Sequence, residues 1–304
     1  MILLYGTNFD SPLLDIYKIL FQRNESVMFL NQEDVGKMRI SFATDPELIC
    51  IIRLPNKTID LRSVTATYYR PYDWREFSQF SSSSSSDQNW QLAQINESIL
   101  NIWTELTDSL VINKPSMMGN NNSKPLQSEI IKSIGFRTPE TLITTNPNTV
   151  KSFHKKHKTV IYKSISGVRS IVSKLNTEKL SELNDVQWCP TQFQEYVKGI
   201  DYRIHVIGDS IFPCKILSHA DDYRYSSKTG RTTRLVKSTI PLDVQQKCIK
   251  LTKKLGLLIS GIDLRQNPNG DWYCFEVNPT PGYTFYQEQT GQPIGQKIAD
   301  LLSL

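Results

Sequence analysis

The chain has 304 residues, of which 39% are apolar and 21% charged, and its formal net charge is +5. This composition is typical of a globular protein with a large core, and the length suits two domains or one domain of several lobes. No apolar run reaches the roughly 18 residues of a membrane-spanning helix, so we expect no membrane segment and a cytoplasmic location. The mild positive charge permits anionic ligands but lacks the concentrated patch of a nucleic-acid binder.

The cysteines and the first residues of the chain give little support to zinc ligands, disulfides or a signal peptide. No C-x-x-C pair occurs among the five cysteines, and each lies beside an apolar residue, so buried free thiols are a better interpretation than zinc ligands or disulfides. The opening residues, MILLYGTNF, have neither the basic region nor the cleavage site of a signal peptide, and they predict a first strand.

Residues 1–75 predict a small α/β unit. Apolar residues recur at helical spacing in Ser11–Gln22, which indicates a helix. We expect strands at 2–5, 26–30, 48–52 and 64–69. The last strand ends in Tyr69-Arg70-Pro71, where the proline stops it. Arg70 is either functional or part of a solvated edge, and the solvated edge is the commoner case.

The middle of the chain predicts helices separated by polar loops. The six serines of 81–86 predict a mobile loop. An apolar stripe then predicts a long amphipathic helix packed on the core, with Leu92, Ile95, Ile99, Ile102, Trp103 and Leu106 as its members. Another helix begins at Lys124-Pro125 and ends at Gly135, and a strand follows at Thr141–Thr144. The lysines and histidines of 151–158 favour a solvated helix face over a metal site.

The second half opens with a strand at 160–163 and a small-residue loop at 164–170, which could fold over phosphates but lacks the Walker pattern. A strand at 192–197 leads into the alternating segment 201–207. There Tyr202, Ile204 and Val206 face one way, and Asp201, Arg203 and His205 the other. Gly208-Asp209 predicts a hairpin turn. Residues 219–237 predict a polar loop that is functional or disordered.

A second hairpin is the most informative stretch of the sequence, GIDLRQNPNGDWYCFEVNPTPGY. Asn269-Gly270 indicates a two-residue loop, and counting back from it places Asp263 opposite Glu276. Asn278 points to the same face, because it lies two residues beyond Glu276. Two acids so close repel each other unless a cation lies between them, and an all-oxygen cluster suits Mg²⁺. The alternative is an exposed hairpin with two solvated acids.

These features together indicate a nucleotide enzyme. The sequence contains neither G-x-S-x-G nor H-E-x-x-H, so serine-hydrolase and zinc-protease chemistry has no support. Lys124 and Lys163 lie at junctions between loops and regular elements, and Asp201 and Arg203 follow a strand break. Lysines combined with Mg²⁺ are what a polyphosphate needs.

The order of segments over residues 110–304 resembles the ATP-grasp superfamily. The resemblance implies ATP and Mg²⁺ as cofactors and an α/β fold with three parts: a pre-ATP-grasp domain (1–112), a central subdomain (113–192) and a C-terminal antiparallel-sheet subdomain (193–304). It assigns phosphate binding to Lys124 and Lys163. Adenine is assigned to the hinge at Gln194, Glu195 and Val197, ribose to Asp201, and magnesium to Asp263, Glu276 and Asn278.

Within that superfamily the sequence is most similar to the graspetide synthetases, the microviridin-type peptide macrocyclases. The stretches that carry this likeness are Tyr69-Arg70-Pro71, Asn113-Lys114-Pro115 with Lys124 and Gln127, Asp222-Tyr223-Arg224, and Glu276-Val277-Asn278-Pro279 with Gln289-Thr290-Gly291-Gln292-Pro293-Ile294. One departure is Thr280-Pro281-Gly282, which stands where that family more often has Asn-Gly and is similar to amino-acid and glutamate ligases.

The resemblance implies a ligase that activates Asp or Glu side chains of a ribosomal precursor peptide as acyl phosphates and closes ω-ester or ω-amide rings. Arg203 would stabilise the charge that develops, and Asp222 and Arg224 would contact the leader or core of the peptide. One alternative is a RimK-like ligase that adds an amino acid to a small molecule or protein terminus, and another is a non-catalytic nucleotide-binding regulator. No nucleic-acid or membrane partner is expected, and the sequence leaves a homodimer open.

Overall fold

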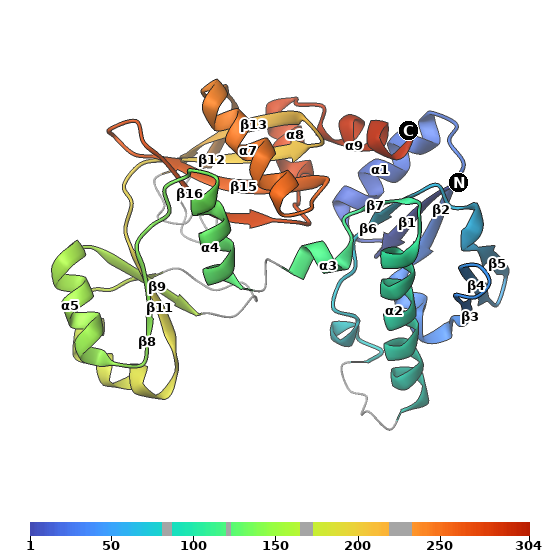
Figure 1. Cartoon of the computed structure of the whole chain (residues 1–304), viewed down its shortest axis with the longest axis horizontal. Coiled ribbons are helices and arrows are strands. Elements are labelled where there is room, and N and C mark those ends of the chain that lie inside the picture. Colours follow the sequence, from blue (N-terminus) through green and yellow to red (C-terminus); the bar gives the residue numbers. More distant parts are fainter. Residues whose placement is uncertain (81–86, 120–122, 165–172, 219–232) are drawn as a thin grey trace.

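The computed structural model describes residues 1–80, 87–119, 123–164, 173–218 and 233–304 (Figure 1). The serine run, most of the small-residue loop at 164–170, and both Asp222 and Arg224 lie outside the described residues. No helix in the described part of the chain is long and apolar enough to cross a membrane.

A parallel four-stranded sheet forms the centre of the N-terminal unit, in the order β2-β1-β6-β7. Its strands are β1 (Ile2–Gly6), β2 (Val27–Asn31), β6 (Ala66–Tyr69) and β7 (Leu110–Ile112). Helix α1 (Ser11–Gln22) packs on the face of Ile2 and Leu4, while α2 (Gln88–Leu106) packs on the opposite face with Leu3 and Tyr5. Alternate apolar residues of one strand therefore serve two separate cores.

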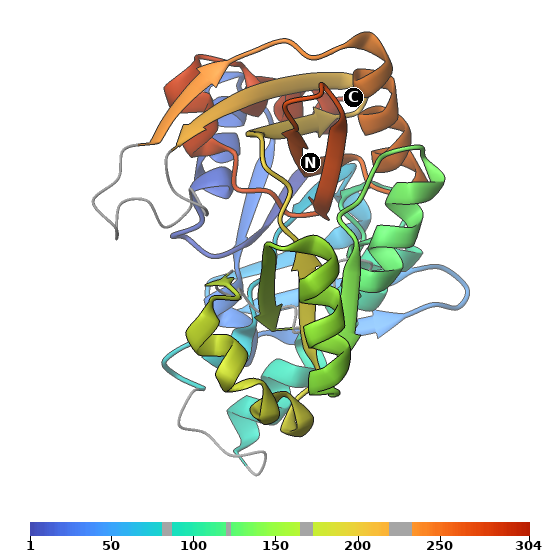
Figure 2. The same ribbon diagram turned by 90° about the vertical axis from the view of Figure 1, so that its left-hand side faces the viewer.

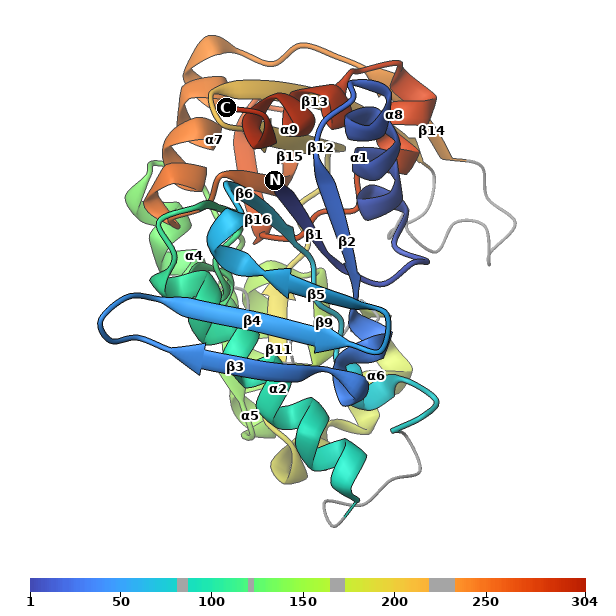
Figure 3. The same cartoon turned by 90° about the vertical axis from the view of Figure 1, so that its right-hand side faces the viewer.

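Short elements surround this sheet. An antiparallel sheet of β3 (Arg39–Ala43), β4 (Ile49–Leu54) and β5 (Lys57–Asp60) lies across the unit (Figure 3). The 3₁₀ helices η1 (Gln32–Lys37) and η2 (Leu61–Ser63) connect strands, and η3 (Trp74–Glu76) lies between β6 and α2. The strand expected at 48–52 thus belongs to this second sheet, as β4.

Helix α2 corrects the expected apolar stripe. Ile95, Ile102 and Leu106 are about half exposed, at 55%, 47% and 51%. The buried face instead carries Asn96 and Glu97 next to apolar residues such as Trp103. These polar residues can take core positions because they have partners: Asn96 Nδ2 donates to the Val35 and Met38 carbonyls, and Tyr5 Oη donates to Glu97.

A second antiparallel sheet, in the order β10-β9-β11-β8, forms the central part of the chain. Its strands are β8 (Thr141–Thr144), β9 (Val160–Ser164), β10 (Ser173–Lys174) and β11 (Thr191–Glu195). The helices α5 (Pro147–His157), α6 (Thr177–Ser181) and η5 (Leu183–Trp188) accompany it. The lysines of α5 are exposed as expected, but the His157 side chain is 10% exposed and lies 3.4 Å from both Glu140 and Glu195.

The C-terminal sheet has the order β14-β13-β12-β15-β16 and stands above the central sheet in Figure 2. Its strands are β12 (Ile200–Ile207), β13 (Ser210–Ser218), β14 (Thr233–Lys237), β15 (Ile259–Gln266) and β16 (Trp272–Asn278). The helices of this part are α3 (Pro115–Met118), α4 (Lys124–Ser133), α7 (Leu242–Lys254), α8 (Thr284–Thr290) and α9 (Ile294–Leu302). The polar loop expected over 219–237 is wrong at its end, because β14 begins at Thr233. Leu235 pairs with Ile216 there and buries its side chain.

The hydrophobic clusters show how these parts are joined. One cluster combines β1, β6 and α1 with Ile207, Ile259, Tyr283 and α9, so the N-terminal unit and the C-terminal sheet share a core. Ile131 and Ile134 of the α4 region belong to the core under the C-terminal sheet. The central sheet has a separate core around Phe153 and Phe193. The three-part division expected from the sequence remains a prediction.

The expectation of buried free thiols is confirmed for four cysteines and is wrong for Cys189, which is exposed. All five cysteines are free; Cys50, Cys214, Cys248 and Cys274 are buried, whereas Cys189 is exposed.

Candidate functional site

The hairpin of β15 and β16 places Asp263 opposite Glu276, as expected. Its loop and its strand pairing differ from those expected. The loop has three residues rather than two, since Asn267 N–H donates to the Asp271 carbonyl and Gly270 adopts a φ of +87°. A β-bulge then inserts Phe275, because Leu264 pairs with Cys274 and Asp263 with Glu276. The longer turn and the bulge each shift the register by one residue, in opposite directions, so the facing pair is preserved.

Asp263, Glu276 and Asn278 therefore lie on one face of the sheet, since Asn278 pairs with Gly261 two positions along. Two carboxylates and an amide oxygen form a hard, all-oxygen donor set that fits Mg²⁺. Asn278 Oδ1 also accepts the Thr280 N–H at 2.9 Å and the Thr280 hydroxyl at 3.5 Å, which fixes its side chain. Among the described residues no group of three or more His, Cys, Asp and Glu side chains could hold a metal ion, so a metal site on this face would include the Asn278 amide as its third protein ligand.

Arg203 of β12 shares this face. It pairs across the sheet with Asp263, and its Nη1 lies 2.7 Å from Asp263 Oδ1. Its side chain is only 8% exposed, and its guanidinium carbon lies 6.0 Å from the centre of the Tyr286 ring on α8. A buried cation is thereby held beside Asp263, and the role expected for Arg203 in stabilising charge remains a prediction.

Gly261 leaves the space that Arg203 occupies. A Cβ atom at this position would lie 2.2 Å from Arg203 Nη2. We expect Gly261→Ala to displace the guanidinium and to lower ATP turnover by about 100-fold, the usual cost of losing one charge-stabilising donor. Gly282→Ala is the matched control, because nothing lies within 4 Å of its Cβ position. Steady-state ADP release checks this, and equal rates for the two variants would contradict it.

His205, two residues along the same strand face, is a buried group without charge. It is fully buried, and the centre of the Tyr286 ring lies 5.0 Å from that of its imidazole. Within the described part of the chain, neither ring nitrogen has a hydrogen-bond partner. Burial, with a smaller contribution from Arg203, holds the pKa of His205 well below its usual range. The unfolded chain therefore binds a proton that the folded protein does not when the pH falls below about 6.5.

This depressed pKa predicts acid sensitivity. Stability should fall with pH below about 6.5, and His205 should contribute up to about 1.4 kcal/mol per pH unit until the folded-state pKa is reached. His205→Phe should remove that contribution while keeping the ring contact with Tyr286. Urea denaturation of the wild type and of His205→Phe at several pH values gives the slope of unfolding free energy against pH for each protein. The difference between the two slopes isolates His205, because the other titrating groups contribute to both. Parallel pH profiles would show that His205 is not the cause.

A cavity of about 400 Å³ lies beside β16, where Cys274 and Phe275 line it. Lys124 of α4, Lys163 of β9 and Gln194 of β11 all line it, although they come from three separate segments. Phe275, the bulged residue next to Glu276, forms part of the same wall. The two expected phosphate-binding lysines thus share one cavity, and this cavity adjoins the strand that carries the expected metal ligands.

Of the described residues expected at the hinge and ribose positions, only Gln194 lines the cavity. Arg265, which was not predicted from the sequence, contacts two of the remaining residues. It donates to both carboxylate oxygens of Asp201 at 2.6 and 2.8 Å and to the Val197 carbonyl at 2.7 Å. Glu195 accepts the Glu140 N–H through its side chain. Arg265 is directly opposite Asp201 between β12 and β15, so counting strand pairs could have found it.

Two buried amides hold the strand that carries the expected metal ligands. Gln127 of α4 pairs with both backbone polar groups of Val277 at 2.9 Å. Asn113 donates to the carbonyls of Ile259 and Pro279 at 2.9 and 2.6 Å. These side chains fix the end of β16 from two sides.

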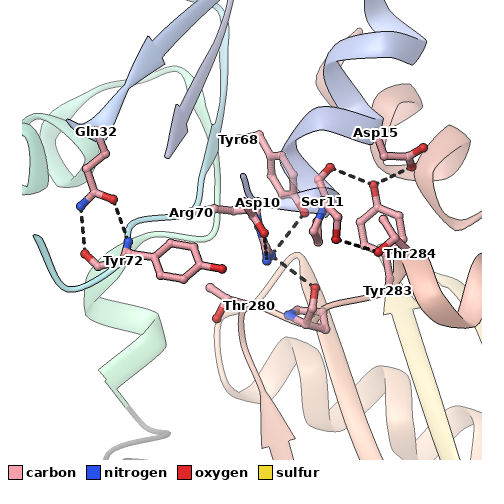
Figure 4. Close-up of polar contacts among 12 residues, drawn as sticks. Asp10, Ser11, Asp15, Gln32, Tyr68, Arg70, Tyr72, Thr280, Tyr283 and Thr284 are labelled. Carbon is pink, nitrogen blue, oxygen red and sulfur yellow. Dashed lines mark hydrogen bonds and ion pairs between the residues drawn. The ribbon is translucent and has the colours of Figure 1, made fainter. Parts of the chain in front are cut away.

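Arg70 corrects the interpretation as a solvated edge. Its side chain is 8% exposed and forms a bidentate ion pair with Asp10 (Figure 4). Arg70 Nη1 donates to the Pro281 carbonyl at 3.3 Å, in the segment that follows Asn278. Tyr283 Oη donates to Asp15 at 2.9 Å close by. The N-terminal unit therefore supports the segment directly after β16.

Comparison with known proteins identifies the architecture. A profile of the RimK-like ATP-grasp domain matches residues 121–302. A probable alpha-L-glutamate ligase of Vibrio atlanticus (strain LGP32) is 23% identical over 209 residues, which cover 65% of this chain and 68% of that protein.

Solved structures match nearly the whole length of the chain. A macrocyclase, MdnC of Microcystis aeruginosa MRC, bound with its precursor peptide MdnA, has a TM-score of 0.83 at 21% identity and covers 100% of both chains. A RiPP-associated ATP-grasp ligase of Chryseobacterium gregarium, in complex with ADP and a leader and core peptide, has a TM-score of 0.85 at 23% identity and covers 99% of this chain and 96% of that one. The α/β class and the ATP-grasp resemblance expected from the sequence are confirmed.

Proposed function

This chain belongs to the RimK-like ATP-grasp family, whose ligases use ATP, and we propose that it is a peptide macrocyclase. In this proposal it activates an Asp or Glu side chain of a ribosomal precursor peptide and joins it to a Thr, Ser or Lys side chain of the same peptide. The observation that supports it most strongly is that Lys124 and Lys163 line one cavity together with Phe275 of β16. The next residue of that strand, Glu276, faces Asp263, which pairs with Arg203.

The proposed reaction has two steps. A carboxylate oxygen of the peptide attacks the γ-phosphorus of ATP, and ADP leaves as the acyl phosphate forms. The hydroxyl or amine then attacks the acyl carbon and loses its proton, and inorganic phosphate leaves with the original carboxylate oxygen. Each ring therefore costs one ATP and removes the elements of one water from the peptide.

The chain's own residues have distinct roles in these steps. Lys124 and Lys163 neutralise the polyphosphate in the cavity. Asp263, Glu276 and Asn278 would hold Mg²⁺, which supplies charge neutralisation between the terminal phosphates. Arg203, already beside Asp263, stabilises the charge that develops during transfer. Asp201, Glu195 and Val197 remain proposals for ribose and adenine contacts. Asp222 and Arg224, outside the described residues, remain proposals for peptide contacts.

The likeness to MdnC extends through the N-terminal unit, and this supports a peptide as the substrate. The main alternative is a RimK-like ligase that adds an amino acid to a small molecule or protein terminus. Thr280-Pro281-Gly282 and the glutamate-ligase name of the Vibrio relative favour that alternative. A non-catalytic regulator is disfavoured, because the lysines, the acids and Arg203 are all present.

Mass spectrometry separates these functions. The protein is incubated with MgATP and the short peptide encoded beside its gene. The proposal predicts ADP release and the loss of one water's mass per ring. A mass gain equal to an added residue would establish the alternative ligase instead, and an unchanged peptide without ADP release would contradict both ligase functions.

A further inference from the structure

The parallel sheet of the N-terminal unit contains a topological switch point. β1 and β6 are neighbours, but the chain continues from β1 to β2 on one side and from β6 to β7 on the other. The connections that leave the carboxyl ends of such strands diverge and leave a crevice, which is where open parallel sheets bind ligands. The connection after β1 carries Phe9 and Asp10, and the connection after β6 carries Arg70 and Tyr72.

A neutral ion pair occupies the space between these two connections. Asp10 and Arg70, one from each connection, form the buried ion pair, with side chains 3% and 8% exposed. The Pro281 carbonyl accepts a further hydrogen bond from Arg70. Because Arg70 is committed to these partners, it does not offer a free positive charge to a ligand's carboxylate.

Two aromatic residues remain exposed at the rim. Phe9 and Tyr72 are 58% and 46% exposed, and their rings meet edge to face with centroids 5.5 Å apart. The backbone of Tyr72 is fixed, because Gln32 Nε2 donates to its carbonyl at 2.9 Å and Gln32 Oε1 accepts its N–H at 2.8 Å. An exposed aromatic pair on a fixed backbone offers apolar contact area with little loss of conformational entropy.

The rim adjoins the candidate active face. Figure 4 shows the Tyr72 hydroxyl pointing toward Arg70 and Thr280. Thr280 lies two residues after Asn278, and its N–H is hydrogen-bonded to the Asn278 side chain. A peptide residue resting on Phe9 and Tyr72 would thus lie next to the end of the strand that carries the expected metal ligands.

We propose that Phe9 and Tyr72 form a binding site for an uncharged apolar or aromatic residue of the peptide, adjacent to the residue whose hydroxyl or amine attacks the acyl phosphate. This inference rests on the proposed function and concerns the part of the peptide that supplies the attacking hydroxyl or amine. The neutralised Arg70 disfavours the other occupant, a free amino acid, whose carboxylate would require an unpaired cation at this position.

The test measures binding to the full-length protein without ATP. Acetyl-phenylalanyl-threonine amide is titrated into the wild type, Phe9→Ala, Tyr72→Ala and Tyr72→Phe, with saturation-transfer NMR as the readout. Each alanine variant should weaken binding about fivefold, in line with the usual strength of an aromatic contact, and Tyr72→Phe should remain close to the wild type. Acetyl-aspartyl-threonine amide should bind more weakly than the phenylalanyl probe.

Phe21→Ala is the matched control. Phe21 is 67% exposed and stacks on Tyr17, but it lies at the far end of α1 from the rim, so its loss should leave the affinity unchanged. Equal affinities for the phenylalanyl probe in the wild type and both alanine variants would overturn the assignment, and so would tighter binding of the aspartyl probe. Ring formation by the wild type, measured separately with MgATP, decides the proposed function: its absence would overturn that function rather than the rim assignment.

Discussion

Replacing Glu276 with glutamine is expected to abolish ATP turnover while the fold stays intact. Glu276 faces Asp263 on the sheet, and the amide that replaces its carboxylate lacks the charge needed to hold Mg²⁺ near the phosphates. Because transfer to a carboxylate develops charge on the phosphoryl oxygens, we expect a loss of about 1,000-fold in ADP release. The substitution conserves volume, so the free energy of unfolding should change by less than about 0.5 kcal/mol.

The control for this variant is Glu288→Gln on α8. Glu288 is exposed and should tolerate the same substitution without effect on ADP release. Coupled-enzyme detection of ADP and urea denaturation of all three proteins give the comparison. ADP release near the wild-type rate from Glu276→Gln would refute the metal assignment.

Replacing Arg70 with alanine is expected to produce the largest loss of stability. It leaves the Asp10 carboxylate buried without its cation, and it removes the hydrogen bond to the Pro281 carbonyl. Breaking one partner of a buried ion pair typically costs about 3–5 kcal/mol. Urea denaturation should show this loss, and ATP turnover should also fall, because the segment after Asn278 loses its support from the N-terminal unit.

Arg62→Ala provides the comparison for an exposed pair. Arg62 contacts Asp60 and Glu47, but its side chain is 47% exposed, so its loss should cost less than about 1 kcal/mol. The double variant of Asp10→Ala with Arg70→Ala should lose less than the sum of the single losses, because neither charge is then left unpaired. Similar costs for Arg62→Ala and Arg70→Ala would show that burial does not strengthen the Arg70 pair.

Local patterns predicted most of the elements that carry the site. α1 has the expected bounds because its apolar spacing is regular, and Pro125 marks the start of α4. The hairpin register was predicted through two compensating errors: the sequence indicated a two-residue loop at Asn269-Gly270 and gave no sign of the bulge at Phe275. Such a bulge depends on packing around both strands, which one strand's sequence does not contain.

Long-range partners account for the remaining differences. Arg70 reads as a strand-end cation, but its partners lie 60 residues away at Asp10 and 211 residues away at Pro281. Arg265 likewise takes its role from Asp201 on another strand. On α2, Asn96 and Glu97 occupy core positions because distant groups satisfy them, while Ile102 remains half exposed. Burial of polar groups depends on such partners and not on periodicity.

The central claim is that the protein activates a carboxylate by phosphorylation, and one isotope measurement tests it most directly. The peptide encoded beside the gene is prepared with heavy oxygen in its Asp and Glu side-chain carboxylates and incubated with the protein and MgATP. The account predicts that one heavy oxygen per ring appears in the released inorganic phosphate, detected by mass spectrometry. Ring formation with unlabelled phosphate, or with the heavy oxygen in AMP, would contradict it.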